Sequence, residues 1–272
     1  EALRAHGLTV DSAQFGNFNV PVRATDNASE LGTNELVVLG VKMYDFEDAA
    51  AATKQALAAE GVALTLQNGL DAPFELAKTV GRERVLVGTI AIEAAIGGPG
   101  VVAHTTPFHQ LTLAELDGPP TPRLETLVGH LTEAGLAAQA APDGPQALWH
   151  KAAILIPLAT LTSAGDLNAG GITGDPELLR LYDELCTEFS ALAQANGRDV
   201  SQALAWVRAQ AHSVPAMTSS MNRDFRLGRR VELEWLTGKV VRLAREQGVA
   251  VPAHAALYAL LKHRAQRTSE NR

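Results

Sequence analysis

The feature that most constrains the fold is a regular alternation of apolar and helical segments in the first third of the chain. Apolar segments typical of parallel strands buried on both faces are Glu35–Tyr44, Val62–Leu66 and Arg84–Ile92. Segments with helical spacing between them are Phe46–Glu60, which we expect Gly61 to end, and Ala72–Val80. The order strand, helix, strand, helix, strand predicts an α/β domain with a doubly wound sheet.

The pattern changes near residue 142. Before it we expect a helix end at Glu1–His6, extended segments at Leu8–Val10 and Phe18–Thr25, short edge or antiparallel strands at Val101–Thr106 and Phe108–Leu113, and a helix at Leu124–Ala134. After the Pro-Asp-Gly-Pro loop, helical periodicity runs through 146–164, 176–196, 200–212, 231–247 and 253–264. The sequence therefore predicts an α/β domain over 1–142 and an all-helical domain over 143–272.

Composition excludes several functional classes. The net charge of −7 over 272 residues argues against nucleic acid or an anionic membrane as the main partner. The single Cys186 excludes a disulfide framework, and the eight His residues lack metal-ligand spacing, so no metal site is expected. The longest apolar run, Ala152–Leu161, is too short to cross a bilayer. We expect a soluble, cytoplasmic protein.

Two polar positions follow predicted strands. Lys42 lies near the end of the first strand, and Asn68-Gly69 ends the second. Open α/β sheets bind ligands at the carboxyl ends of their strands, so these residues are candidates for a ligand site. The alternative is a charge emerging at a strand end and a turn that uses Asn and Gly for their tolerance of positive φ.

Lys151 begins an apolar helix whose next residues on the same face are Leu155 and Ala159. Removal from water favours the neutral form of a lysine and eases proton donation. The alternative is a side chain that reaches solvent from the helix end. We expect Pro157 to kink or interrupt this helix.

A third group of candidates is Ser220 and Glu232. On one straight helix they would lie about 18 Å apart, so we expect Gly228 to break the path and let the chain turn back. Four arginines nearby could attract an anion or form a solvated basic loop: Arg223, Arg226, Arg229 and Arg230. Glu232 could alternatively stabilise the first turn of the following helix.

These motifs together resemble the ketopantoate reductase (2-dehydropantoate 2-reductase) family. The motifs are VKMYD at Lys42, LQNGL at Asn68, LWHK at Lys151, and the long stretch from SSMNRDF at Ser219 through RRVELEW to GVAVP. The last stretch is the most specific, and the resemblance runs from near residue 1 to about residue 263.

The resemblance implies a Rossmann-like NADPH-binding domain, a helical domain and reduction of a 2-oxo acid by hydride transfer. It assigns Lys151 as general acid, Glu232 as the acid that orients the site, and Ser220 as a substrate-binding hydroxyl. Asn68 corresponds to the residue at the junction of cofactor and substrate, and Lys42 to a cofactor-binding lysine near the nicotinamide. A homodimer is also expected, because the helices have apolar faces.

Two departures from the family pattern affect what we expect. The G-x-G-x-x-G turn that holds the pyrophosphate is absent, so we expect an N-terminally truncated chain that lacks the first βαβ unit and does not bind a dinucleotide tightly alone. Family members that reduce ketopantoate usually carry Asn where this chain has Leu155, Ala159 and Met217. That change suits a paralogue with a more hydrophobic 2-oxo acid.

Two other classes of function stay open. One is a non-catalytic scaffold that keeps the fold without the dinucleotide site. The other is a dehydrogenase of a different hydroxy or amino acid that uses the same lysine chemistry.

Overall fold

The computed structural model describes residues 1–270 and contains two compact units. The first comprises Glu1–Val41, Asp45–Gln67 and Pro73–Gly144, and the second comprises Lys42–Tyr44, Asn68–Ala72 and the chain from Pro145 onward. Two short segments that follow strands of the first unit therefore belong to the second unit. The sequence pattern did not predict that these two segments belong to the second unit.

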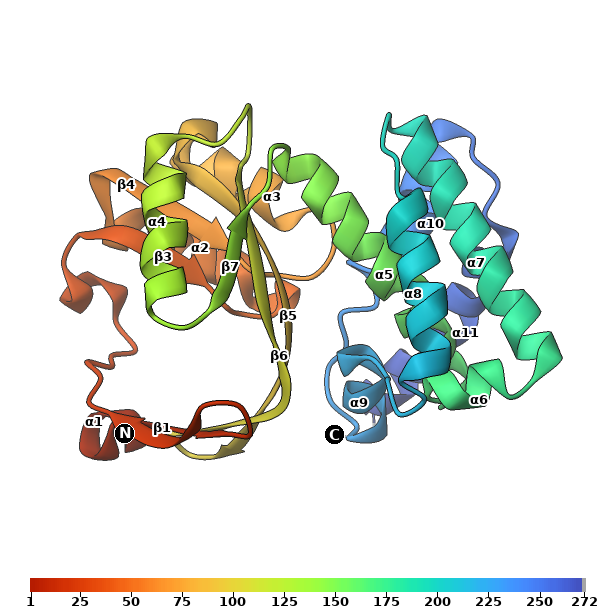
Figure 1. Cartoon of the computed structure of the whole chain (residues 1–272), viewed down its shortest axis with the longest axis horizontal. Helices are drawn as coiled ribbons and strands as arrows, with labels where there is room; N and C mark the ends of the chain where they lie inside the picture. Colours follow the sequence, from red (N-terminus) through yellow and green to blue (C-terminus); the bar gives the residue numbers. More distant parts are fainter. Residues whose placement is uncertain (271–272) are drawn as a thin grey trace. The chain divides into compact units, whose positions relative to one another are not determined.

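The first unit is built on a seven-stranded mixed sheet (Figure 1). Its strands are β1 Leu8–Ser12, β2 Gly16–Val20, β3 Asn34–Leu39, β4 Leu57–Thr65, β5 Val85–Gly98, β6 Val101–Glu115 and β7 Ala137–Ala140. The spatial order is β2-β1-β6-β5-β4-β3, and β7 pairs with β6. β3, β4 and β5 are parallel, as predicted, but β5 and β6 form a long antiparallel pair.

The expectation of a doubly wound sheet is thus corrected to a mixed sheet. The chain reverses between β5 and β6 at Gly100, whose φ of 75° lies in the left-handed region that favours glycine. A short reversal of this kind returns the chain antiparallel, whereas a parallel neighbour needs a long crossover. The two short strands expected at Val101–Thr106 and Phe108–Leu113 are one continuous strand, β6.

The helices of the first unit are α1 Ala2–His6, α2 Phe46–Ala56, α3 Ala72–Val80 and α4 Pro122–Glu133, with short 3-10 turns η1 Ala28–Leu31 and η3 Arg82–Arg84; a third 3-10 turn, η2 Met43–Asp45, begins in the Lys42–Tyr44 segment of the second unit. α2 ends four residues earlier than predicted. Gly61 lies inside β4 rather than after the helix, and a Cβ there would come within 2.6 Å of the Asn34 carbonyl oxygen. The close approach of β3 therefore requires glycine at position 61. The sequence pattern instead predicts that this glycine ends the preceding helix.

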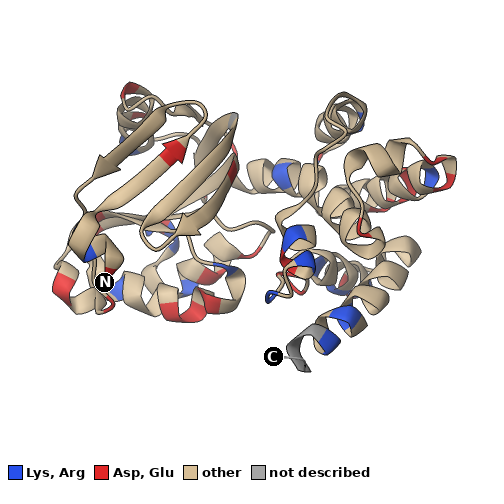
Figure 2. Ribbon diagram, turned by 90° about the horizontal axis from the view of Figure 1, so that it is seen from below, with Lys and Arg blue, Asp and Glu red and all other residues tan. Residues whose placement is uncertain are grey.

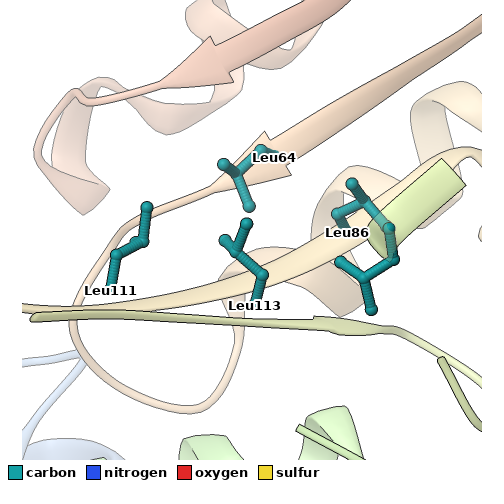
Figure 3. Close-up of a cluster of buried hydrophobic side chains, with 5 residues drawn as sticks. Leu64, Leu86, Leu111 and Leu113 are labelled. Atoms are coloured by element: carbon teal, nitrogen blue, oxygen red, sulfur yellow. The ribbon is translucent and has the colours of Figure 1, made fainter. Parts of the chain in front are cut away.

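The core of this unit lies between the sheet and α4. Figure 3 shows its central leucines: Leu64, Leu86, Leu111 and Leu113, which with Leu124 of α4 are all at most 5% exposed. Full burial of a leucine side chain stabilises a fold by about 1.5–3 kcal/mol. The strands are mostly tan in Figure 2, which marks residues other than Lys, Arg, Asp and Glu, and most of the charged residues lie on the helices and loops. β3, expected to be buried on both faces, is the last strand in the sheet order, and Val38 is 49% exposed.

The second unit is helical apart from its loops. Its helices are α5 Gly144–Gly165, α6 Ala169–Thr173, α7 Pro176–Ala195, α8 Ser201–Ser213, α9 Ser220–Arg226, α10 Thr237–Gln247 and α11 Pro252–Glu270. The expected interruption at Pro157 is wrong, because α5 continues through it. The flanking residues Ile156 and Leu158 are buried, and their packing outweighs the roughly 3 kcal/mol that an interior proline costs a helix.

The stretch predicted as one helix over 231–247 is a loop followed by a helix. Residues 233–236 form turns, and α10 begins only at Thr237. Gly228 has a φ of 63° and lies just after α9, so the predicted break at this glycine is confirmed. No helix among residues 1–270 is long and apolar enough to span a bilayer.

Candidate active site

Lys42 follows β3 and forms an ion pair with each of two carboxylates of the second unit. Its Nζ lies 2.8 Å from Glu232 Oε2 and 3.2 Å from Asp224 Oδ2. The other oxygen of Glu232, Oε1, accepts a hydrogen bond of 3.0 Å from the backbone N–H of Met43. Glu232 is 4% exposed, so its buried charge is compensated from two sides.

The electrostatics of Lys42 reflect this pairing. Burial acts to lower the pKa of Lys42, but the charges and hydrogen bonds of Glu232 and then Asp224 outweigh it, and the pKa is raised above 10.5. Lys42 is therefore a permanent cation in the neutral range.

The Asn68 turn lies against the same loop. Gly69 has a φ of 102°, and a Cβ at this position would come within 2.9 Å of the Trp235 carbonyl oxygen. Two residues further on, Asp71 forms a 2.6 Å ion pair with Lys239 of α10. The structure thus brings the segments of Lys42 and Asn68 to one stretch of chain, residues 232–239.

Aromatic side chains flank this stretch. The ring centroids of Tyr44 and Trp235 lie 6.5 Å apart, and the Arg230 guanidinium lies 4.4 Å from the centroid of the Tyr44 ring. In the predicted arginine group, Arg226 forms an ion pair with Asp166 at 2.5 Å. At least these two arginines have partners within the chain, which favours the structural alternative for them.

Ser220 is the first residue of α9 and is partly exposed. Its neighbour Ser219 is buried and caps the helix, because its Oγ accepts a 3.0 Å hydrogen bond from the Asn222 N–H. Ser219 Oγ also lies 3.2 Å from the Thr162 hydroxyl of α5. This contact fixes the start of α9, and with it Ser220, against α5.

Lys151 lies on the same face of α5 as Thr162. Residues eleven apart lie about 20° from each other around an α-helix and about 16 Å apart along it, so this face leads from Lys151 to the start of α9. Leu155 and the fully buried Ala159 lie between them. Burial lowers the pKa of Lys151 below its usual 10.5, the direction expected from its apolar neighbours.

Sequence reasoning missed Asp224, Tyr44 and Trp235. The signal for Asp224 was a carboxylate in the arginine-rich stretch SSMNRDFRLGRR, four residues before Gly228. The turn at Gly228 then returns the chain, and Asp224 and Glu232 meet at Lys42. Within residues 1–270, no group of three or more His, Cys, Asp or Glu side chains is arranged to hold a metal ion.

Comparisons with known proteins give a consistent result. The C-terminal family model of ketopantoate reductase PanE/ApbA matches residues 145–265, and the model of ketopantoate reductase PanE/ApbA matches residues 1–118. A 2-dehydropantoate 2-reductase of Halobacterium salinarum is 33% identical over 246 residues, which cover 89% of this chain and 79% of the relative.

Solved structures extend the likeness to the fold. A PanE/ApbA family ketopantoate reductase from Ralstonia eutropha is similar with a TM-score of 0.90 at 26% identity, over 98% of this chain and 88% of that one. A D-mandelate dehydrogenase, solved with NADH and anilino(oxo)acetate, has a TM-score of 0.87 at 19% identity, over 98% and 87% of the two chains. At that identity the likeness concerns the fold alone.

Proposed function

Since this chain belongs to the ketopantoate reductase PanE/ApbA family of NAD(P)-dependent 2-oxo acid reductases, we propose that it reduces ketopantoate or a related 2-oxo acid to the 2-hydroxy acid with NADPH. The observation that carries the proposal is the position of Lys151 on the apolar face of α5, partly buried beside Leu155 and Ala159, where burial lowers its pKa. A lysine in that state releases its proton more readily than one in water.

Lys151 acts as the general acid. The nicotinamide cofactor supplies the hydride to the ketone carbon when it is bound. The electron pair of the carbonyl double bond moves to the oxygen, which takes a proton from Lys151 Nζ. The lysine leaves the step neutral and regains its proton from water. This transfer lets the alcohol form without a full negative charge on the oxygen.

Glu232 orients the site through the Lys42–Tyr44 segment. Its two oxygens bind Lys42 Nζ and the Met43 N–H, so it fixes the backbone directly after β3. In this proposal Ser220 binds the substrate, and Asn68 contacts both substrate and cofactor. Lys42 supplies positive charge on the cofactor side.

The residues after β3 and β4 fit the polar nicotinamide end of the cofactor. Gln67 donates hydrogen bonds from Nε2 to the carbonyl oxygens of Leu39 and Val41, at 2.9 and 3.0 Å. These two carbonyls fix the amide orientation and leave Oε1 buried, without a hydrogen-bond partner among the described residues. A buried acceptor of this kind favours a ligand with N–H or O–H donors, as a carboxamide or a ribose has. Lys42 and Asn68 follow the same strand ends and would bind this end of the cofactor.

The substrate is the finer part of the proposal. Between Lys151 and Thr162, the face of α5 is formed by Leu155, Leu158 and Ala159, and it offers no side-chain hydrogen-bond donor. A 2-oxo acid with an apolar side chain suits this face better than one that carries a hydroxyl. Ketopantoate and a more hydrophobic 2-oxo acid are therefore the two candidates.

The test is NADPH oxidation, followed by absorbance, with ketopantoate and with 2-oxoisovalerate or phenylglyoxylate. Turnover that depends on the 2-oxo acid and is lost in Lys151→Ala supports the proposal. The matched control is Lys54→Ala, on the exposed side of α2, which should keep full activity. Absence of turnover with every 2-oxo acid, despite NADPH binding, would favour a dehydrogenase of another substrate.

NADPH binding is measured separately by the change in nicotinamide fluorescence. If the chain binds no dinucleotide at all, the scaffold alternative is favoured over the reductase. A second titration with NADH decides between the two cofactors. Light scattering of the same sample tests the expected homodimer.

A further inference from the structure

We propose that Asp224 is a positioning residue for the reductase: it holds Lys42 in place and thereby fixes the Lys42–Glu232 pair. This inference rests on the proposed function. It adds a residue to which the sequence analysis assigned no role, and it assigns to Asp224 a role exerted through Lys42 rather than on the substrate.

The geometry gives Lys42 two anchors of different strength. Glu232 Oε2 lies 2.8 Å from Nζ, and Asp224 Oδ2 lies 3.2 Å from it. The side chains of Glu232 and Asp224 are only 5% and 13% exposed, whereas that of Lys42 is 38% exposed. The two carboxylates therefore hold the ammonium from the protein side, and its remaining exposure leaves it accessible to a ligand.

One anchor would not fix the ammonium. A lysine bound to a single carboxylate can still rotate about its four-carbon stem, since an ammonium is a compact charge without directional preference. A second carboxylate restricts it to the position between the two. The other oxygen of Glu232, Oε1, accepts the hydrogen bond of the Met43 N–H. A movement of Lys42 that displaces the Glu232 carboxylate therefore also disturbs this second hydrogen bond.

The hydrogen bonds that cap α9 and form the turn after it do not use the Asp224 carboxylate. Ser219, not Asp224, caps the N-terminus of α9. The Arg229 N–H bonds to the backbone oxygen of Asp224 at 2.8 Å, so this turn does not depend on the carboxylate. A further ion pair of α9, Arg226 with Asp166, is half exposed and does not include Lys42. Asp166 therefore provides a control for the general effect of removing a carboxylate beside this helix.

The experiment compares Asp224→Asn with Asp166→Asn in the full-length protein. We expect Asp224→Asn to lower kcat by about 10- to 100-fold, because a displacement of about 1 Å in a site can cost 100-fold. KM for the 2-oxo acid should change by less than about threefold. Asp224→Glu, which keeps the charge, should restore part of kcat, and Asp166→Asn should leave both constants unchanged.

A double-mutant cycle with Lys42→Met tests whether Asp224 acts through Lys42. In the Lys42→Met background, Asp224→Asn should have no further effect on kcat. A loss of kcat that persists at full size in that background overturns the proposal. So does a loss of kcat in Asp224→Asn that is matched by Asp166→Asn.

The same cycle, measured as the urea midpoint of unfolding, separates this proposal from the proposed function. Coupling between the two substitutions in unfolding is expected, and its absence would show that the ion pair is not formed in solution, which overturns the proposal. If wild type reduces no 2-oxo acid, the proposed function fails by itself, and the positioning role fails with it even where the unfolding cycle shows coupling.

Discussion

Lys42 and Lys151 are two lysines of the second unit whose pKa values move in opposite directions. Burial lowers the pKa of Lys151. Burial acts on Lys42 in the same way, but Glu232 and Asp224 raise its pKa above the ordinary value. The difference lies in the neighbouring charges, since α5 contains no Asp or Glu in its 22 residues and Lys42 touches two carboxylates.

This contrast corresponds to two roles that a lysine can have in a reductase. A lysine with a lowered pKa gives up its proton more readily and suits a general acid. A lysine with a raised pKa keeps its proton and suits a fixed cation. The proposed assignment of Lys151 as donor and Lys42 as anchor follows from these surroundings.

The largest predicted effect comes from Lys151→Arg. Arginine keeps the positive charge but cannot release a proton, because a guanidinium stays protonated at every pH at which the protein is folded. We expect kcat to fall by about 100- to 10,000-fold, the usual contribution of general acid catalysis. Steady-state NADPH oxidation measures this loss, with Lys54→Arg on the exposed side of α2 as control. An active Lys151→Arg enzyme would show that only charge is needed there.

The pH dependence of kcat sharpens the same point. The general acid must be protonated, so activity should fall as pH rises through the pKa of Lys151, at a pH below 10.5. Lys42 stays protonated over that range and should contribute nothing to this limb. The pH profile of Lys42→Arg should therefore match that of wild type on its alkaline side.

The carboxylate of Glu188, which pairs with His254, is a third case in which burial and neighbouring groups shift a pKa in opposite directions. Burial acts to raise the pKa of Glu188, but hydrogen bonds from the His254 ring and from the N–H groups of His254 and Ala253 outweigh it, and the pKa is lowered. Glu188 therefore stabilises the native state above its unfolded pKa of about 4.5. That contribution is lost as pH falls through the lower, folded pKa.

Replacement of this carboxylate tests the sign of the effect. Glu188→Gln should lower the free energy of unfolding at pH 7 by about 1–3 kcal/mol, since it weakens charged hydrogen bonds at the start of α11. The difference from wild type should shrink as pH falls from about 6 to 3. Thermal unfolding across this range measures it, and a difference that grows toward acid pH would contradict the assignment.

The sequence predicted regions where one local pattern decides the structure. The bounds of α3 agree with the predicted Ala72–Val80, and three parallel strands form where apolar runs indicated them. Removal of Lys151 from water could be predicted because Leu155 and Ala159 lie on its own helix. The break at Gly228 could be predicted from the backbone freedom of glycine.

Features that depend on distant residues could not be predicted in this way. The ion pair of Lys42 with Asp224 joins residues 182 apart in the sequence. The continuation of α5 through Pro157 depends on packing against other helices, which overrides the local preference of proline. The antiparallel pairing of β6 with β5 is confirmed as one of the two alternatives expected for residues 101–113, but the union of the two short strands into one long strand was not predicted.

The smallest predicted effect belongs to Lys42→Arg, and it completes the contrast with Lys151→Arg. If Lys42 acts as a fixed cation, arginine should serve in its place, because a guanidinium can bind both Asp224 and Glu232. We expect kcat to fall by less than about 10-fold, the cost of fitting a wider head group into this position.

Lys42→Met, which removes the charge, is the matched control and should lower kcat well beyond that of Lys42→Arg. It leaves Glu232, which is 4% exposed, with one partner fewer. Equal losses in the two variants would mean that Lys42 is needed for more than its charge. The same substitution, Lys to Arg, is thus expected to be severe at residue 151 and mild at residue 42, since only one of the two lysines has to give its proton away.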